Sequence, residues 1–140
     1  MQALARTYGI EVLRQAMRDL IERSAAQMRE AIGKLKPGTY RFEDKLDDVG
    51  PGTAPVVAKV AVTIDEGGVT VDWTGSGPQR EAGLNSYLSY TNAYALAAVK
   101  SVTLPLLPQN AGTMRLIRTV APEGCFFNPR RPAPCGGRAT

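Results

Sequence analysis

The chain of 140 residues contains no histidine, and this absence excludes more chemistry than any other feature of its composition. A Ser-His-Asp or Cys-His mechanism needs an imidazole as its base, so neither can be completed within this chain. Zinc sites with histidine ligands are excluded too, and two cysteines cannot form a closed all-thiolate site, which needs about four. Catalysis by this chain alone would therefore depend on carboxylates, lysine, tyrosine or backbone groups.

The sequence also lacks long hydrophobic runs. No apolar segment approaches the roughly 20 residues that a membrane span requires, and the N-terminus lacks the continuous apolar region of a signal peptide. We therefore expect no membrane association and a cytoplasmic location. Cys125 and Cys135 are the only cysteines, and without other signs of secretion we expect two thiols rather than a disulfide.

Charge and hydrophobic content favour one folded domain. Hydrophobic residues make up 44% of the sequence, and the length suits a single domain, so we treat residues 1–140 as one unit. The 17 basic residues outnumber the 13 acidic ones, which gives a net charge of +4. Because the basic residues are scattered and form no stripe interleaved with aromatics, we expect no nucleic-acid partner.

The N-terminal part carries the pattern of a long amphipathic helix. Apolar residues recur three and four positions apart from Ile10 to Leu35, and charged residues take the other faces. Gly9 separates a short preceding turn, and the Lys-Pro-Gly sequence at 36–38 ends the helix. The sequence therefore predicts one continuous helix of about 39 Å, at roughly 1.5 Å per residue.

The hydrophobic period then changes to two, which predicts strands. Alternation over residues 39–47 indicates a first strand, residues 56–64 a second and residues 69–73 a third. The Gly67-Gly68 pair between the second and third strands is typical of a tight hairpin connection. We therefore expect an antiparallel hairpin that the first strand extends to a meander.

The remaining sequence predicts one more helix and one more strand. Residues 87–104 are rich in alanine and aromatics and carry only Lys100 as a charge, so we expect this helix to lie between layers or against a partner. Residues 114–121 predict a strand, and proline and glycine dominate from Pro122 onward. The expected fold class is α+β, with a long N-terminal amphipathic helix, an antiparallel β-meander or hairpin, a second apolar helix, then a strand and a Pro/Gly-rich extended tail.

The most informative segment is the run Val-Asp-Trp-Thr-Gly-Ser-Gly-Pro-Gln at 71–79. A loop this rich in glycine is costly to order and exposes backbone donors, so we expect it to serve a ligand or an unusual turn. It lacks the lysine of a P-loop and the third glycine of a dinucleotide fingerprint. An anion-binding nest of backbone N–H groups or a tight turn remains, and the tight turn is the commoner outcome. Asp72 would either orient a substrate or cap that turn.

Other polar residues carry weaker signals. Four acidic residues at positions 43–48 could bind Mg²⁺ or Ca²⁺, but their spacing fits no EF-hand loop and we favour a solvated strand face. Asn85 is placed to cap the N-terminus of the second helix, a role that does not exclude contact with a ligand. Cys135 has no histidine to act as its base, so we interpret it as a small filler.

Short motifs rich in glycine, proline and polar residues are spread from the end of the first helix to the end of the chain. They are Gly38-Thr39-Tyr40-Arg41-Phe42-Glu43-Asp44, Leu46-Asp47-Asp48, Val71-Asp72-Trp73-Thr74-Gly75-Ser76, Pro78-Gln79, Gly83-Leu84-Asn85, Tyr90-Thr91, Asn110-Ala111-Gly112, Ala121-Pro122-Glu123-Gly124, Asn128-Pro129 and Gly137-Arg138. In order and spacing they resemble the hydantoinase B/5-oxoprolinase family, which includes the α subunit of acetone carboxylase and one half of eukaryotic 5-oxoprolinase. The resemblance covers essentially the whole chain, and it is specific because several unrelated loop motifs coincide.

The resemblance implies a part in the ATP-dependent opening of a small cyclic amide such as 5-oxoproline or a hydantoin. In the family's scheme a hydantoinase A-type subunit uses ATP to phosphorylate the amide oxygen, and the B-type subunit takes the activated intermediate to hydrolysis. The resemblance thus implies a hetero-oligomer, no cofactor bound by this chain, and a divalent metal held elsewhere in the full-length subunit. Lys45 and Val49 replace the tyrosine and aspartate of the family pattern, which argues against a metal in the acidic stretch.

For this chain the resemblance implies a supporting role in a pocket wall or subunit contact, and no residue is named as a catalyst. The residues assigned to substrate binding are Asp72, Thr74, Gly75, Asn85, Gly137 and Arg138. Because the family's subunit is several times longer, we expect an internal fragment that is inactive alone and exposes apolar surface around residues 87–102, with a tendency to associate. Two alternatives stay open: an assembly module packing on the A-type subunit, or part of an acetone carboxylase-like ketone carboxylase.

Overall fold

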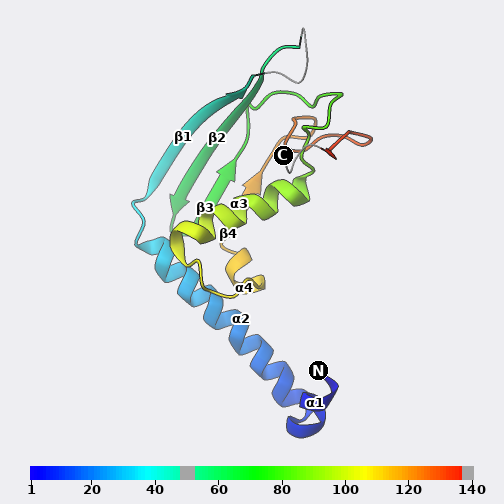
Figure 1. Cartoon of the computed structure of the whole chain (residues 1–140). Helices are drawn as coiled ribbons and strands as arrows, with labels where there is room; N and C mark the ends of the chain where they lie inside the picture. The colour runs from blue at the N-terminus through cyan, green and yellow to red at the C-terminus, as the bar shows by residue number, and fades with distance from the viewer. Residues whose placement is uncertain (48–52, 137–140) are drawn as a thin grey trace.

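The computed structural model describes residues 1–47 and 53–136, and within them the chain forms helices and one mixed sheet (Figure 1). The helices are α1 (Gln2–Tyr8), α2 (Ile10–Gly33), α3 (Leu88–Thr103) and α4 (Ala111–Met114). The strands are β1 (Gly38–Leu46), β2 (Val56–Asp65), β3 (Gly68–Asp72) and β4 (Ile117–Val120). The α+β class expected from the sequence is therefore confirmed, with each predicted helix and strand present within a few residues of its expected bounds.

The sheet has the strand order β1-β2-β3-β4. β1 pairs antiparallel with β2 and β2 antiparallel with β3, which confirms the meander. β4 pairs parallel with β3, because the chain crosses over the sheet through α3 and α4 before it returns (Figure 1). The sequence predicted this strand but not its direction, since a parallel pairing depends on the path of the connection and not on the strand's own residues.

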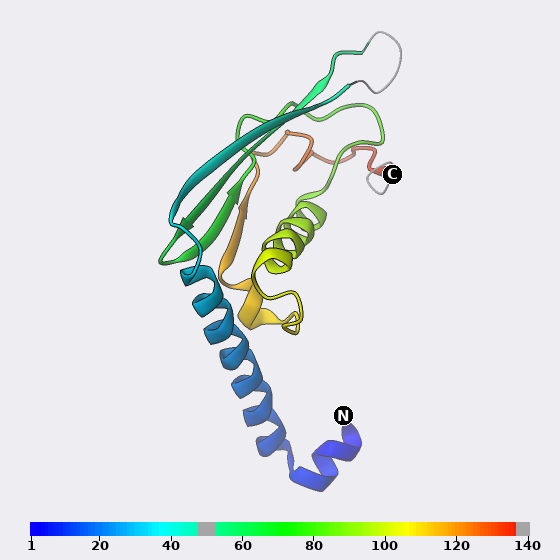
Figure 2. The same ribbon diagram turned by 60° about the vertical axis from the view of Figure 1, so that its left-hand side comes forward.

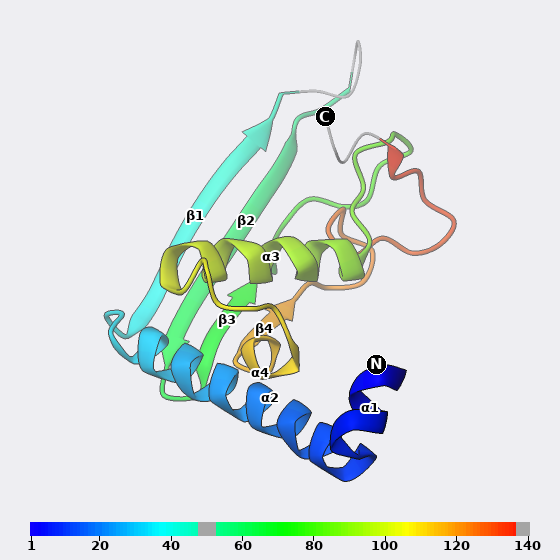
Figure 3. The same ribbon diagram turned by 60° about the horizontal axis from the view of Figure 1, so that its bottom comes forward.

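The hydrophobic core lies between one face of the sheet and the helices that cross it. Figures 2 and 3 show α3 lying over this face, with α2 running along the end of the sheet where β2 turns into β3. The core side chains come from all of these elements and from the residues next to β4: Met28, Ile32, Val69, Val71, Ala95, Leu96, Val99, Leu116 and Ile117. The core is thus centred on β3 and β4, and it does not extend to β1.

The two main helices are less buried than their sequences suggested. In α2 only the C-terminal half contributes buried residues, namely Ser24, Ala25, Met28 and Ile32, while α1 and the first half of α2 project away from the sheet (Figure 2). The expectation that α3 would be enclosed between layers is wrong for its outer face, since Tyr94 is 62% and Val102 76% exposed. The predicted apolar surface around residues 87–102 is confirmed.

The short helix α4 was not predicted. It begins after Asn110, whose Oδ1 accepts from Gly112 N at 2.9 Å, while the Thr113 hydroxyl and the Asn110 backbone complete a capping box. Asn110 Nδ2 also donates to Ser24 Oγ of α2 at 2.8 Å. A Cβ at Gly112 would overlap the Ile21 carbonyl oxygen, so the absence of a side chain permits the close approach of α4 to α2.

Both cysteines are buried thiols, as expected from the sequence. Within residues 1–47 and 53–136, no helix has the length and apolar character needed to cross a membrane.

Candidate functional site

The loop after β3 begins with a tight turn. Asp72 Oδ1 accepts hydrogen bonds from Thr74 N at 2.9 Å and from Thr74 Oγ1 at 2.6 Å, and Ser76 N donates to Trp73 O at 3.1 Å. Gly75 has a φ of 90°, the positive value that the third position of a type II turn requires. The sequence left a tight turn or an anion-binding nest open, and the structure has the tight turn, with Asp72 as its cap.

Beyond the turn the chain fills the place where β3 has ended. Ser76 Oγ accepts from Lys59 N at 3.0 Å and donates to Lys59 O at 2.9 Å, and Gly77 N donates to Val57 O at 2.7 Å. Phe126 N then donates to Gly77 O at 3.1 Å from the other side. A serine side chain therefore replaces the backbone of a strand neighbour at the point where the turn interrupts the ladder.

The backbone donors of this loop are already used within the protein. The N–H groups of Thr74, Ser76 and Gly77 donate to Asp72, Trp73 and Val57 respectively. A nest must leave several successive N–H groups pointing at an anion. The loop between β3 and α3 therefore offers no backbone nest, and its glycine content follows from the turn and from close packing.

Asn85 joins the end of this loop to the C-terminal residues. Its Oδ1 accepts from Arg80 N at 2.8 Å, and its Nδ2 lies 2.6 Å from Arg80 O, 3.1 Å from Ala82 O and 2.9 Å from Pro134 O. The side chain is fully buried. The predicted role as a helix cap is wrong, because α3 begins at Leu88 with Tyr87 as its cap residue and no capping side chain.

The C-terminal strap, defined here as residues 121–136, follows the loop along its length. Gln79 Oε1 accepts from Arg130 N at 2.7 Å, the Tyr87 hydroxyl donates to Ala133 O at 3.1 Å, and the Arg131 guanidinium lies 4.7 Å from the centre of the Tyr87 ring. Near the start of the strap, Asn128 Nδ2 donates to Ala121 O at 2.9 Å and closes a local turn. Glycine, proline and amide motifs far apart in sequence thus interlock into one loop layer.

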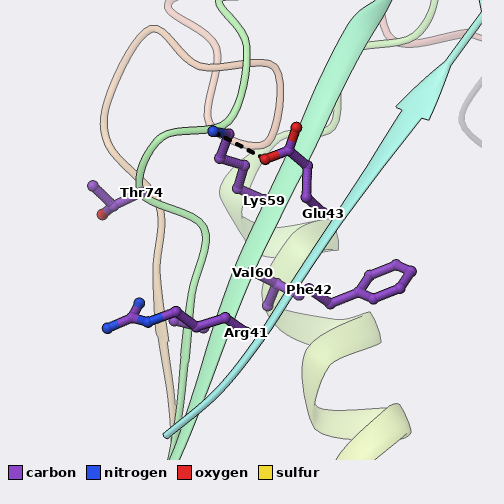
Figure 4. Close-up of a pocket in the computed structure, with 7 residues that line it drawn as sticks. Arg41, Phe42, Glu43, Lys59, Val60 and Thr74 are labelled. Atoms are coloured by element: carbon purple, nitrogen blue, oxygen red, sulfur yellow. Dashed lines mark ion pairs between the residues drawn. The ribbon is translucent and has the colours of Figure 1, made fainter.

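A hollow of about 360 Å³ lies on the outer face of the sheet beside the Thr74 turn (Figure 4). In Figure 4 Arg41 and Lys59 extend to the same side of the sheet, and Phe42 extends to the opposite side. Lys59 Nζ forms a salt bridge of 3.0 Å with Glu43 Oε2, and both side chains are about half exposed. This hollow brings together one sequence-predicted residue, Thr74, with three charged side chains that sequence reasoning treated as a solvated strand face.

A second hollow of about 240 Å³ lies on the core side of the same turn, under the start of α3. Its lining is mostly aromatic: Trp73, Leu84, Ser86, Tyr90, Thr91, Tyr94, Phe126 and Phe127. The Trp73 and Phe127 rings are 4.1 Å apart at their centres, and Trp73 Nε1 is buried with no hydrogen-bond partner. No sequence pattern indicated this hollow, because Phe126 and Phe127 come from the strap that was expected to be an extended tail.

The family model described as "Hydantoinase B/oxoprolinase" matches the chain over residues 1–140. The chain belongs to the hydantoinase B/oxoprolinase family. Among its relatives, the B-type subunit of a putative D-/L-hydantoinase from Pseudomonas sp. (strain NS671) is 35% identical over 138 residues, which is 91% of this chain and 23% of that protein. A 5-oxoprolinase from Dictyostelium discoideum is 25% identical over 136 residues, covering 92% of this chain and 10% of the relative.

Two solved structures share the fold of this hydantoinase B/oxoprolinase chain. An ATP-dependent caprolactamase from Pseudomonas jessenii superposes with a TM-score of 0.80 at 24% identity, over 94% of this chain and 23% of its own. A nucleotide-free acetone carboxylase superposes with a TM-score of 0.83 at 16% identity, over 99% of this chain and 20% of its own. The chain therefore spans less than a quarter of the length of each of these relatives.

The structure places the predicted site residues of this family member in different settings. Asp72, Thr74 and Gly75 form the turn beside the outer hollow, Asn85 is buried among backbone carbonyls, and residues 137–138 (Gly137 and Arg138) lie outside the described residues. The structure therefore brings the first three together at the surface and separates Asn85 from them.

The described residues also bear on a divalent metal. In residues 1–47 and 53–136, no three or more histidine, cysteine, aspartate or glutamate side chains gather in a group that could hold a metal ion. Of the acidic stretch, Glu43 pairs with Lys59, Asp44 accepts from Lys45 N at 2.8 Å, and Asp48 lies outside the described residues. The donor set of the described residues does not fit such a metal.

Proposed function

We propose that this chain is part of the B-type subunit of an ATP-dependent hydrolase of cyclic amides, and that it is inactive without the rest of that machinery. The observation that carries the proposal is the family match over the whole chain, together with 35% identity to the B-type subunit of a hydantoinase. The fold shared with an ATP-dependent caprolactamase supports it, because caprolactam is a cyclic amide.

Within that subunit the chain acts as a frame and supplies no catalyst. It has no histidine, and the backbone donors of its glycine-rich loop are already satisfied within the protein. A frame of this kind holds a pocket wall in place through packing and hydrogen bonds. ATP is used by the A-type partner subunit, and the residues that activate the amide belong to parts of the machinery beyond the described donors.

One observation favours a second candidate, an assembly module that packs on the A-type subunit. The outer face of α3 presents Tyr94 and Val102 to solvent, at 62% and 76% exposure, and Leu88 at 40%. Exposed apolar faces of this kind mark surfaces that another polypeptide covers. The two candidates differ in where they respond: a pocket wall responds to the cyclic amide, and an assembly module responds only to the partner.

The test combines a rate with a binding measurement. Phosphate release from ATP is followed with 5-oxoproline, hydantoin or caprolactam, for the chain alone and for the chain with an A-type subunit. We expect no amide-dependent release from the chain alone. Two-dimensional amide NMR of the chain with its A-type partner, with and without the cyclic amide, then separates the candidates. Shifts around residues 72–79 on adding the amide support the pocket wall, and shifts confined to α3 on adding the partner support the assembly module.

A further inference from the structure

β1 is an edge strand whose outer side has no neighbour among the described residues. All nine of its residues are exposed, and β2 occupies its other side along the whole length. Figures 1 and 3 show β1 as the outermost strand, with the helices gathered at the far side and the end of the sheet. An edge strand presents a row of unpaired backbone N–H and C=O groups, so a strand this long and this exposed is a template for another strand.

The side chains of β1 complement a second copy of themselves. If two copies pair antiparallel about a two-fold axis at Phe42, Arg41 of each copy lies opposite Glu43 of the other. The same register aligns Gly38 with Leu46, so all nine residues of both strands are paired. Opposite charges directly across an antiparallel pair stabilise it.

Neighbouring registers are unfavourable. A shift that centres the axis on Arg41 or on Glu43 sets two like charges directly opposite each other, and centring it on Asp44 does the same. Shifts by half a step exchange the two faces of the strand and set apolar positions against charged ones. The register centred on Phe42 is the one that pairs the full strand without a like-charge contact.

The core-side face of β1 adds apolar surface to this edge. Phe42 is 65%, Tyr40 47% and Leu46 45% exposed, although they share their face with Val60 and Val62 of β2, which pack against the core. In the paired arrangement the two Phe42 rings lie side by side at the axis and cover part of this surface. The covered area and the charge pattern therefore favour the same register.

We propose that β1 is a docking edge for a second copy of this chain, so that two copies pair antiparallel at Phe42 and form one continuous sheet. The salt bridge of Glu43 with Lys59 is compatible with this, because the carboxylate has a second oxygen that can accept from Arg41 of the second copy. The inference goes beyond the proposed function, since it rests on the strand alone and holds for any activity of the subunit.

Cysteine cross-linking tests the register directly. Facing residues in an antiparallel pair have Cα atoms about 4.5–5.5 Å apart, which suits a disulfide. Phe42→Cys should therefore form a disulfide-linked dimer under mild oxidation. Tyr40→Cys, on the same face and also exposed, should not, because its copies are offset by about 13 Å along the strands at roughly 3.3 Å per residue. The native cysteines are buried, so they stay out of the reaction.

A charge exchange tests the pairing independently. In a Lys59→Gln background, which removes the salt bridge within one copy, Arg41→Glu or Glu43→Arg alone should weaken the dimer about tenfold, since each sets two like-charge pairs across the axis. The double variant should return the dissociation constant to within about threefold of the background. Sedimentation equilibrium measures the constant, and circular dichroism confirms that each variant is folded.

Three results would overturn the proposal. The first is a chain that stays monomeric at all concentrations, and the second is a dimer that Phe42→Cys does not cross-link or that Tyr40→Cys cross-links equally. The third is a double variant no tighter than the single ones. A folded dimer with either of the last two properties would place the contact elsewhere, such as the exposed face of α3.

Discussion

The clearest prediction concerns Asn85, because its side chain ties three segments of the chain together without contacting solvent. Its amide has two N–H groups and one oxygen, so it can make two full donated hydrogen bonds and one accepted bond to the backbone of Arg80, Ala82 and Pro134. At about 1 kcal/mol of net stability each, Asn85→Ala should lower the free energy of unfolding by about 3 kcal/mol. That is a large part of the roughly 5–15 kcal/mol of a typical domain.

Urea unfolding followed by tryptophan fluorescence measures this loss, since Trp73 lies beside the same loop. Asn92→Ala is the matched control, because its half-buried side chain accepts one hydrogen bond, from Thr119 Oγ1 at 2.8 Å, and should cost about 1 kcal/mol. A loss below about 1 kcal/mol at Asn85, together with loss of cyclic-amide binding in the assembled enzyme, would refute the structural role and restore Asn85 as a ligand contact.

The isosteric change Asn85→Asp adds a pH dependence with a defined sign. The introduced carboxyl would be buried against the carbonyl oxygens of Arg80 and Pro134, and both effects raise its pKa in the folded state. The folded state then binds the proton more tightly than the unfolded chain, so the variant is least stable at neutral pH and recovers as the pH falls toward about 4. Unfolding curves at pH 7 and pH 5 check this, and a pH-independent loss would contradict it.

The remaining predictions concern close packing and one buried donor, and urea unfolding tests all of them. Gly68→Ala should cost about 2–4 kcal/mol, because a Cβ there would overlap the Leu116 carbonyl oxygen at a φ of 133°; a smaller loss than at an open position would contradict the contact. Gly112→Ala should cost about 1–3 kcal/mol through its overlap with Ile21, and wild-type stability would show that α4 does not approach α2 so closely. Trp73→Phe should stay within about 1 kcal/mol of wild type, since it removes a buried N–H that has no partner; a larger loss would reveal a bond to that N–H.

The fold was largely predictable from the sequence because its main signals are local. Alternating side chains defined β2 and β3, the Gly67-Gly68 pair defined their hairpin, and apolar spacing defined α2. The burial of these elements was less predictable. The apolar positions in the first half of α2 have the same spacing as Met28, yet they project beyond the body and remain largely exposed.

The loop layer could be predicted only in part, because its contacts join residues far apart in sequence. Asp72 caps its turn through a neighbour two positions away, and that role was anticipated. Asn85 depends on Pro134, 49 positions further along, and no local pattern indicates such a partner. The capping box of α4 was visible in the Asn110 and Thr113 pair, but threonine replaces the usual glutamate or glutamine and the signal was missed.

The most direct test of the central claim uses a hybrid subunit. This chain would replace the matching 138-residue segment of the B-type hydantoinase subunit from Pseudomonas sp., and ATP-dependent hydrolysis of the cyclic amide would be measured with the A-type partner. If the chain is a hydantoinase B-type frame, the hybrid should turn over substrate while the chain alone does not. A hybrid that folds and binds its partner but is inactive, or a chain that hydrolyses the amide alone, would contradict the account.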